Sequence, residues 1–361
     1  MITHEGLTCA ELDITNEKLC ALENIRFYDV RKVPEIRIYG VMDAKDGHRF
    51  CRMPEDIAEA CSVGVAGEGI KGLNYNTAGG RLRFVTTSRY VAIKTLCGNA
   101  RHRHNSSASG ASSFDVYVKK NGKEIFTGII LSPELAPNGY AGAVILPEGV
   151  KEVTVNFPPY CNTSDLYIGL DSTSDLSRRA DYTVESPVVF CGSSITQGGC
   201  ASRPGMSYPC IISRRYDVNI YNLGFSGNFR GQADMIEYIS TLDCSVLVMD
   251  YDHNASVDRL RETHEKLYLR FRETHPETPV VMVGKPDCEA NGESPFRREI
   301  IFTTFNNARL RGEKVVFVDG YSLFGGELRE ECTVDCVHPN DLGMSRMADV
   351  IGKAVYFALS M

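Results

Sequence analysis

The chain has 361 residues, of which 43% are hydrophobic and 24% charged, with a formal net charge of −7. This length exceeds what one hydrophobic core usually serves, so the sequence predicts two domains. The acidic balance argues against nucleic acid and a membrane surface as partners, and no apolar run approaches the roughly 20 residues that span a bilayer.

The 13 cysteines are spread along the chain without paired CxxC spacings, which argues against a zinc site and against a secreted disulfide framework. The opening stretch, MITHEGLTCAELD, lacks the basic and apolar regions of a signal peptide. We therefore expect reduced thiols in a cytoplasmic protein without metal or other cofactor. His102 and His104 are interpreted as part of a polar loop and not as metal ligands.

Up to about residue 185, apolar and polar residues alternate with the period of two that strands show. The predicted strands are 81–85, 90–94, 113–118, 124–130 and 150–157. Asn121-Gly122, between two of them, is typical of a tight hairpin turn. Several short strands separated by turns predict an all-β sandwich over residues 1–185.

From residue 187 onward, apolar strand-like runs alternate with amphipathic helical segments. The predicted strands are 188–190, 218–222, 246–249, 280–283 and 315–318, and the predicted helices are 208–215, 233–239, 258–274, 297–311 and 341–359. This alternation predicts a second domain, residues 186–361, with a mostly parallel sheet covered by helices on both faces. Active sites of such sheets lie beyond the carboxyl ends of the strands.

The first strand of this half runs into the segment VVFCGSSITQGG, which places Ser194 at its carboxyl end. A serine becomes a nucleophile only when a base removes its proton. His338 follows the last strand and precedes the last helix, and Asp335 lies three residues earlier, where its carboxylate can orient the imidazole. The sequence therefore predicts a Ser194–His338–Asp335 arrangement for acyl transfer.

Acyl transfer also needs hydrogen-bond donors for the developing oxyanion, and two further strand-end loops supply them. Gly227 follows the second strand and Asn254 the third, so with the N–H of Ser194 they offer three donors. His253 and Ser193, the neighbours of Asn254 and Ser194, are candidates for contacting substrate.

Each of these residues also has a plainer interpretation. A Gly-Ser-Ser turn is more often only a turn, an Asp-x-x-His segment is commoner as a helix cap, and glycine or asparagine in a loop can serve turn geometry alone. The catalytic interpretation rests on all four segments lying at predicted strand ends on one edge of the sheet.

The order Ser, Gly, Asn, His in separate blocks resembles the SGNH (GDSL-type) hydrolases over essentially residues 187–361. The first block of that family, Gly-Asp-Ser-Leu/Ile, is matched by GSSI at 192–195, which implies that Ser194 is the nucleophile. The Gly-x-Asn-Asp block is matched loosely by DHNA at 252–255, and the Asp-x-x-His block fully by Asp335 and His338. The resemblance implies a flavodoxin-like three-layer α/β/α fold and ester hydrolysis without metal.

Three positions depart from the family pattern. Ser193 replaces an aspartate, Asp252 replaces a glycine, and Ala255 replaces an aspartate. None of them removes an implied catalytic residue, but the changes at 252 and 255 are expected to narrow the pocket for the acyl or leaving group.

The first half resembles the jelly-roll-like sandwich that precedes this hydrolase in certain bacterial members. SFDVY at 113–117 is a near match to their Gly-x-Asp-Leu-Tyr signature, so the two halves together resemble carbohydrate-esterase-type deacetylases. The resemblance implies a serine esterase that releases a short acid, foremost acetate, from a small-molecule or oligosaccharide ester. The alternatives are an acyltransferase that uses the same acyl-enzyme, and a glycan-binding protein without catalysis.

Overall fold

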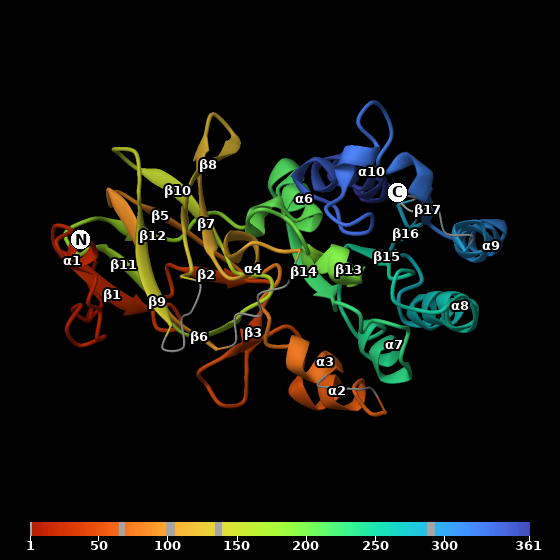
Figure 1. Cartoon of the computed structure of the whole chain (residues 1–361), viewed down its shortest axis with the longest axis horizontal. Coiled ribbons are helices and arrows are strands. Elements are labelled where there is room, and N and C mark those ends of the chain that lie inside the picture. Colours follow the sequence, from red (N-terminus) through yellow and green to blue (C-terminus); the bar gives the residue numbers. More distant parts are fainter. Residues whose placement is uncertain (1, 65–68, 99–104, 134–138, 287–292) are drawn as a thin grey trace. The chain divides into compact units, whose positions relative to one another are not determined.

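The computed structural model describes residues 2–64, 69–98, 105–133, 139–286 and 293–361, and His102 and His104 lie outside this part (Figure 1). The chain forms two compact units. The first comprises Met1–Cys51, Tyr75–Asp181 and Arg203–Gly205, and the second comprises Arg52–Asn74, Tyr182–Ser202 and Met206–Met361. A single cut between 185 and 186 does not describe this division, because the chain enters the second unit early, leaves it and returns.

The first unit is an antiparallel β-domain with two large sheets and, in addition, a two-stranded pairing of Met42–Asp43 (β3) with Phe50–Cys51 (β4). One has the strand order β1-β11-β6-β9, and the other has the order β12-β5-β10-β7-β8 with β2 paired to β5. Their bounds are Ile25–Asp29 (β1), Arg37–Tyr39 (β2), Arg81–Thr86 (β5), Tyr90–Gly98 (β6), Phe114–Lys120 (β7), Lys123–Ile130 (β8), Tyr140–Ile145 (β9), Lys151–Asn156 (β10), Asn162–Asp171 (β11) and Leu176–Ser177 (β12). Both sheets contribute to one apolar core, as Phe84, Ile93, Phe114 and Ile168 illustrate, so the predicted sandwich is confirmed.

The predicted hairpin joins β7 to β8. Asn121 and Gly122 have φ angles of 51° and 76°, the left-handed values that both central residues of a type I′ turn require. Strands β9 and β11 escape prediction for local reasons. The sequence of β9, YAGAVI, has too many small residues for a clear alternation, and β11 contains a register shift between Ser164 and Tyr167.

The second unit has a five-stranded parallel sheet in the order β14-β13-β15-β16-β17. The strands are Val184–Gly192 (β13), Val218–Gly224 (β14), Val246–Asp250 (β15), Val280–Val283 (β16) and Val315–Val318 (β17). The helices between and after them are Ser194–Gln197 (α5), Tyr208–Tyr216 (α6), Ala233–Ile239 (α7), Val257–Thr274 (α8), Ser294–Leu310 (α9) and Asp341–Ala358 (α10). Counted within the unit, the order is 2-1-3-4-5, which is the flavodoxin-like order that the resemblance implies.

Alternate residues of these strands face two different helical layers. Leu247 and Met249 belong to a core that also includes residues of α7, α8 and α9, whereas Val246 and Val248 pack with α6 and α10. The sheet is therefore buried on both faces, which explains why its strands appear in the sequence as nearly continuous apolar runs. Figure 1 shows the resulting three layers.

The segment Arg52–Asn74 belongs to the second unit, although sequence analysis places it in the sandwich. It includes two short helices, Glu55–Ala60 (α2) and Gly69–Leu73 (α3). The buried Arg52 guanidinium donates to the carbonyl oxygens of Gly224, of Asn222 at 3.2 Å and of Leu73 at 2.8 Å. Its carbon lies 4.1 Å from the ring centre of Phe225, so this arginine supports the carboxyl end of β14.

We expect Arg52→Met to destabilise the second unit by about 2–4 kcal/mol, because it leaves several buried carbonyl groups without a donor. Urea unfolding followed by circular dichroism measures the change. Arg89→Met is the control, since the Arg89 side chain is 73% exposed and its pair with Glu148 contributes little. An unfolding midpoint for Arg52→Met equal to that of the control would contradict the supporting role.

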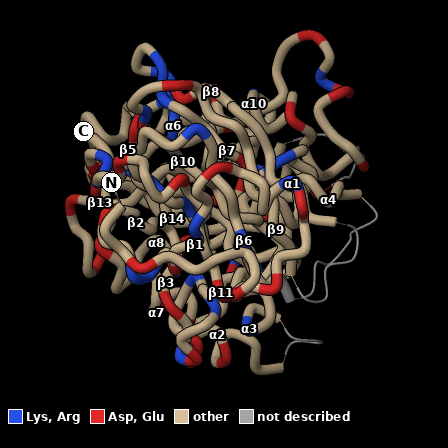
Figure 2. The backbone as a smooth tube through the Cα atoms, turned by 90° about the vertical axis from the view of Figure 1, so that its left-hand side faces the viewer, with Lys and Arg blue, Asp and Glu red and all other residues tan. Residues whose placement is uncertain are grey.

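Acidic and basic residues are mixed along the described backbone (Figure 2). Within the described part of the chain, the helices are too short or too polar to cross a lipid bilayer.

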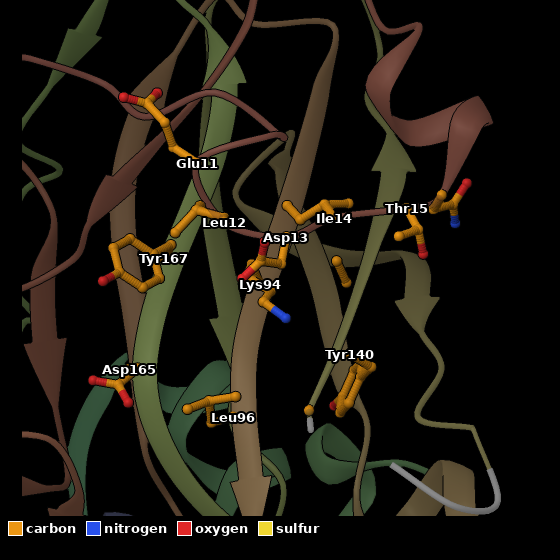
Figure 3. A pocket seen from close by; sticks show the side chains of 13 residues that line it. Glu11, Leu12, Asp13, Ile14, Thr15, Lys94, Leu96, Tyr140, Asp165 and Tyr167 are labelled. Carbon is orange, nitrogen blue, oxygen red and sulfur yellow. The ribbon is translucent and has the colours of Figure 1, made fainter. Parts of the chain in front are cut away.

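A hollow of about 740 Å³ opens on the first unit (Figure 3). Lys94 and Asp13 lie near its middle, with Tyr167 and Tyr140 on either side. It lies in the unit that does not contain Ser194, so it is not the predicted active site.

Candidate active site

Ser194 lies in a tight turn at the carboxyl end of β13. The turn depends on Gly192, where a Cβ atom would lie 2.0 Å from Thr196 Oγ1 and 2.3 Å from the backbone oxygen of Asp250. Only glycine fits so close to the neighbouring strand. Ser194 then begins the one-turn helix α5, and it keeps 8% of its surface exposed.

The Ser194 side chain meets the predicted histidine and, through it, the predicted aspartate. Ser194 Oγ lies 2.8 Å from His338 Nε2, and His338 Nδ1 lies 2.8 Å from Asp335 Oδ2. The other carboxylate oxygen of Asp335 accepts the backbone N–H of His338 at 2.7 Å and that of Val337 at 3.2 Å. The carboxylate therefore positions both the ring and the backbone of the histidine.

The loop that contains His338 is tied at its base. Thr333 and Pro339 form an isolated antiparallel bridge, and Asn340 caps α10 by accepting the Gly343 N–H at 3.1 Å. Because Asn340 is the helix cap, the carboxylate of the Asp-x-x-His segment does not cap α10. Asn340, and not Asp335, is therefore the cap of this helix.

The register of three strands explains why the predicted loops come together. Gly192 of β13 pairs with Gly224 of β14 on one side and with Asp250 of β15 on the other. The loops that follow these strands therefore leave the sheet at one level. These loops contain Ser194, Gly227 and Asn254.

Side-chain contacts join the same loops. Gln197 Oε1 accepts the Ser226 N–H at 2.9 Å, and Asn254 Nδ2 donates to the Phe225 carbonyl at 3.2 Å. Gly227 is exposed and has a φ of 71°, a left-handed conformation that favours glycine. Arg230 Nη2 donates to the Gly227 carbonyl at 2.9 Å and so holds this peptide in place.

Three neighbouring side chains are largely shielded from solvent. Ser193 is buried, and its Oγ accepts the Ile195 N–H at 3.1 Å as the cap of α5. Asp252 is 1% exposed and accepts the backbone N–H of Lys285 at 2.9 Å, so it does not narrow a pocket as sequence analysis expects. The His253 side chain is 6% exposed.

Asp250 is a residue of this region that sequence analysis misses. Its Oδ2 accepts hydrogen bonds from Tyr208 at 2.7 Å and Thr196 at 2.9 Å, which links the end of β15 to α5. Burial raises the pKa of Asp250 to about 7 and the pKa of Asp252 to about 6. Burial also lowers the pKa of His253 well below its ordinary value. The signal in the sequence that could have identified Asp250 is its position as a carboxylate at the end of an apolar strand.

Comparison with known families gives a match for each part of the chain. Residues 185–356 match the model of the GDSL-like lipase/acylhydrolase family, and residues 25–176 match the model of the N-terminal domain of SGNH-hydrolase-type esterases. The chain belongs to the GDSL-type (SGNH) hydrolases. This SGNH hydrolase is therefore an enzyme of the esterase class. No curated protein matches it.

Solved structures similar to this SGNH hydrolase include a putative GDSL-like lipase from Bacteroides ovatus, with a TM-score of 0.81 and 25% identity over 93% of this chain and 98% of that one. A salicylyl-acyltransferase from a tetracycline biosynthetic pathway has a TM-score of 0.74 and 19% identity, over 92% and 98%. A family two carbohydrate esterase from Clostridium thermocellum, solved with cellohexaose, has a TM-score of 0.55 and 14% identity, over 78% and 93%. The last two share the fold of this chain.

Proposed function

We propose that this SGNH hydrolase is a serine esterase that hydrolyses short-chain esters, foremost acetyl esters, with Ser194 as the nucleophile. The observation behind this proposal is the continuous contact from Ser194 Oγ through the imidazole of His338 to Asp335, with both heavy-atom distances at 2.8 Å. A hydroxyl within hydrogen-bond reach of an imidazole that a carboxylate orients is the arrangement that activates serine.

In the proposed reaction, His338 Nε2 takes the proton of Ser194 as Oγ attacks the ester carbonyl carbon. The Asp335 carboxylate holds the Nδ1–H and stabilises the imidazolium. The tetrahedral intermediate collapses when the C–O bond to the alcohol breaks and His338 protonates the leaving oxygen. Water then attacks the acyl-enzyme, with His338 again as base, and releases the acid and the Ser194 hydroxyl.

The proposed oxyanion donors are the backbone N–H groups of Ser194 and Gly227 and the side-chain amide of Asn254. An amide nitrogen has two hydrogens, so Asn254 can donate to Phe225 O and to a substrate oxygen. Loss of one such donor typically raises the barrier by about 3–4 kcal/mol. The Arg230 contact to Gly227 keeps this loop in one conformation before substrate arrives.

The proposed leaving alcohol is a hydroxyl of a carbohydrate. Support comes from the fold shared with carbohydrate esterases and from the match of the first unit to the N-terminal domain of SGNH-type esterases. Transfer of the acyl group to another alcohol would begin with the same acyl-enzyme. Only the second half of the reaction distinguishes a hydrolase from a transferase.

Product analysis tests this proposal. The full chain is incubated with p-nitrophenyl acetate, butyrate and octanoate and with acetylated xylo-oligosaccharides, with and without an excess of a second alcohol. We expect free acetate as the main product under both conditions, and faster release of acetate than of octanoate. Accumulation of the acylated second alcohol in place of acetate would identify a transferase. Failure to cleave any of the esters would contradict the esterase proposal.

A further inference from the structure

Three buried side chains with metal-ligand atoms meet where β15 ends. One ligand atom each from Asp250, Asp252 and His253 lies within 4.8 Å of the other two. The two carboxylates are 0% and 1% exposed, and the histidine side chain is 6% exposed. The loop that contains them continues directly into Asn254.

Part of each carboxylate is held by a hydrogen bond. Asp250 Oδ2 accepts from the Tyr208 hydroxyl at 2.7 Å, and Asp252 Oδ2 accepts from the Lys285 backbone at 2.9 Å. The remaining atoms have no hydrogen-bond partner among the residues that the structure describes, namely Asp250 Oδ1, Asp252 Oδ1 and His253 Nε2. The carboxylates are therefore fixed in position while one oxygen of each is left open.

Such an arrangement is unfavourable unless a cation or a proton is present. A buried polar atom without a partner costs about 1–3 kcal/mol, and a charged one costs more. Asp252 Oδ1 and His253 Nε2 are 3.9 Å apart, which is too far for a hydrogen bond. It is a suitable separation for two ligands of one ion, because bonds of about 2.0–2.2 Å place ligand atoms up to about 4 Å apart.

Two cationic residues, Arg297 and Lys285, act on the charges of the cluster. Arg297 donates to the backbone oxygen of Asp252, and its Nη2 lies 2.9 Å from a carboxylate oxygen of Glu293. Lys285 contacts Asp252 through its backbone N–H. Both charges favour the ionised form of Asp252 and the neutral form of His253, the forms in which these side chains bind a metal ion.

We propose that Asp250, Asp252 and His253 bind one divalent transition-metal ion. Two carboxylate oxygens and one imidazole nitrogen suit Zn²⁺ or Mn²⁺ better than Mg²⁺, which prefers oxygen ligands and keeps several waters. The ion would hold the loop that leads to Asn254, a structural role. This differs from the absence of metal that sequence analysis predicts. It does not depend on the proposed reaction, because ion binding is measured without substrate.

Titration of the EDTA-treated full chain with MnCl₂ tests the site, followed by calorimetry and by the electron paramagnetic resonance signal of free Mn²⁺. Mn²⁺ is used first because the chain has 13 cysteines, and cysteine ligands favour Zn²⁺. ZnCl₂ is then titrated in the same way. We expect about one Mn²⁺ per chain, and we expect Asp252→Asn and His253→Gln each to weaken binding by about 10–100-fold or more.

His48→Gln is the matched control, since it removes a histidine that lies 2.8 Å from Asp165 in the first unit. It is expected to bind Mn²⁺ as the parent does. Circular dichroism shows whether each variant folds. If Asp252→Asn does not fold, the Mn²⁺ affinity of His253→Gln tests the proposal. The proposal is overturned if the parent binds neither Mn²⁺ nor Zn²⁺, or if the folded cluster variants bind as tightly as the parent.

Discussion

Ser194→Ala is expected to lower kcat for p-nitrophenyl acetate by roughly 10³–10⁶-fold, because it removes the hydroxyl that we propose as the nucleophile. Neighbouring hydroxyls are poorly placed to replace it. Ser193 is buried as the cap of α5, and Thr196 Oγ1 donates to Asp250 at 2.9 Å. The expected residual rate comes from the proposed oxyanion donors and from substrate binding, which the variant retains. Stopped-flow and steady-state measurement of p-nitrophenol release give the comparison.

Ser193→Ala is the informative control, because it changes the adjacent residue of the same type. The substitution removes the Ser193 hydroxyl that accepts the Ile195 N–H, so the variant should lose about 0.5–2 kcal/mol of stability. It should keep most of its activity and still be labelled on Ser194 by a fluorophosphonate, as mass spectrometry of the peptides shows. If Ser194→Ala retained the parent rate while Ser193→Ala lost it, the nucleophile would be misassigned.

His338→Gln is expected to lower kcat by about as much as Ser194→Ala, since the serine and its base act as one unit. Asp335→Asn should have a smaller effect, up to about 10⁴-fold, because the amide keeps an acceptor for the backbone but favours the wrong tautomer of His338. The backbone contacts to Val337 and His338 explain why the variant should still fold. The kcat values of the three variants test this order, and we expect KM to be nearly unchanged in each.

Rescue by imidazole in the buffer is a further test of the proposed role of His338 as the base. Added imidazole should partly restore His338→Ala, which leaves a space beside Ser194, and should not restore Ser194→Ala. His275→Gln is the control, because His275 contacts Thr274 and stacks on Phe271. An Asp335→Asn variant with the parent kcat would show that this carboxylate does not orient the base.

Local pattern in the sequence accounts for most of the second unit. The runs that become β13, β15 and β16 are apolar because both faces of the parallel sheet are covered, and the helices between them show one apolar face. Position in the chain then places Ser194 and His338 after strands whose carboxyl ends share an edge. That is why two residues 144 positions apart could be paired from sequence.

Contacts that depend on the path of the chain could not be predicted in this way. Helices α2 and α3 have six and five residues, too few for a clear helical period, and Arg52 reaches the end of β14 across 172 positions. Asp252 was expected to line a pocket, but its side chain is buried. No local pattern distinguishes these outcomes.

The sequence by itself determined the strands and longer helices of the second unit, several strands of the first unit and the candidate residues at strand ends, because each follows from a pattern of residues close together in the chain. Only the tertiary structure decided that Arg52–Asn74 lies in the second unit. It alone also decided that ligand atoms of Asp250, Asp252 and His253 lie within 4.8 Å of one another. Burial and contacts between residues far apart in the sequence depend on how the whole chain packs around its core. The spacing of residues in the sequence does not contain this information.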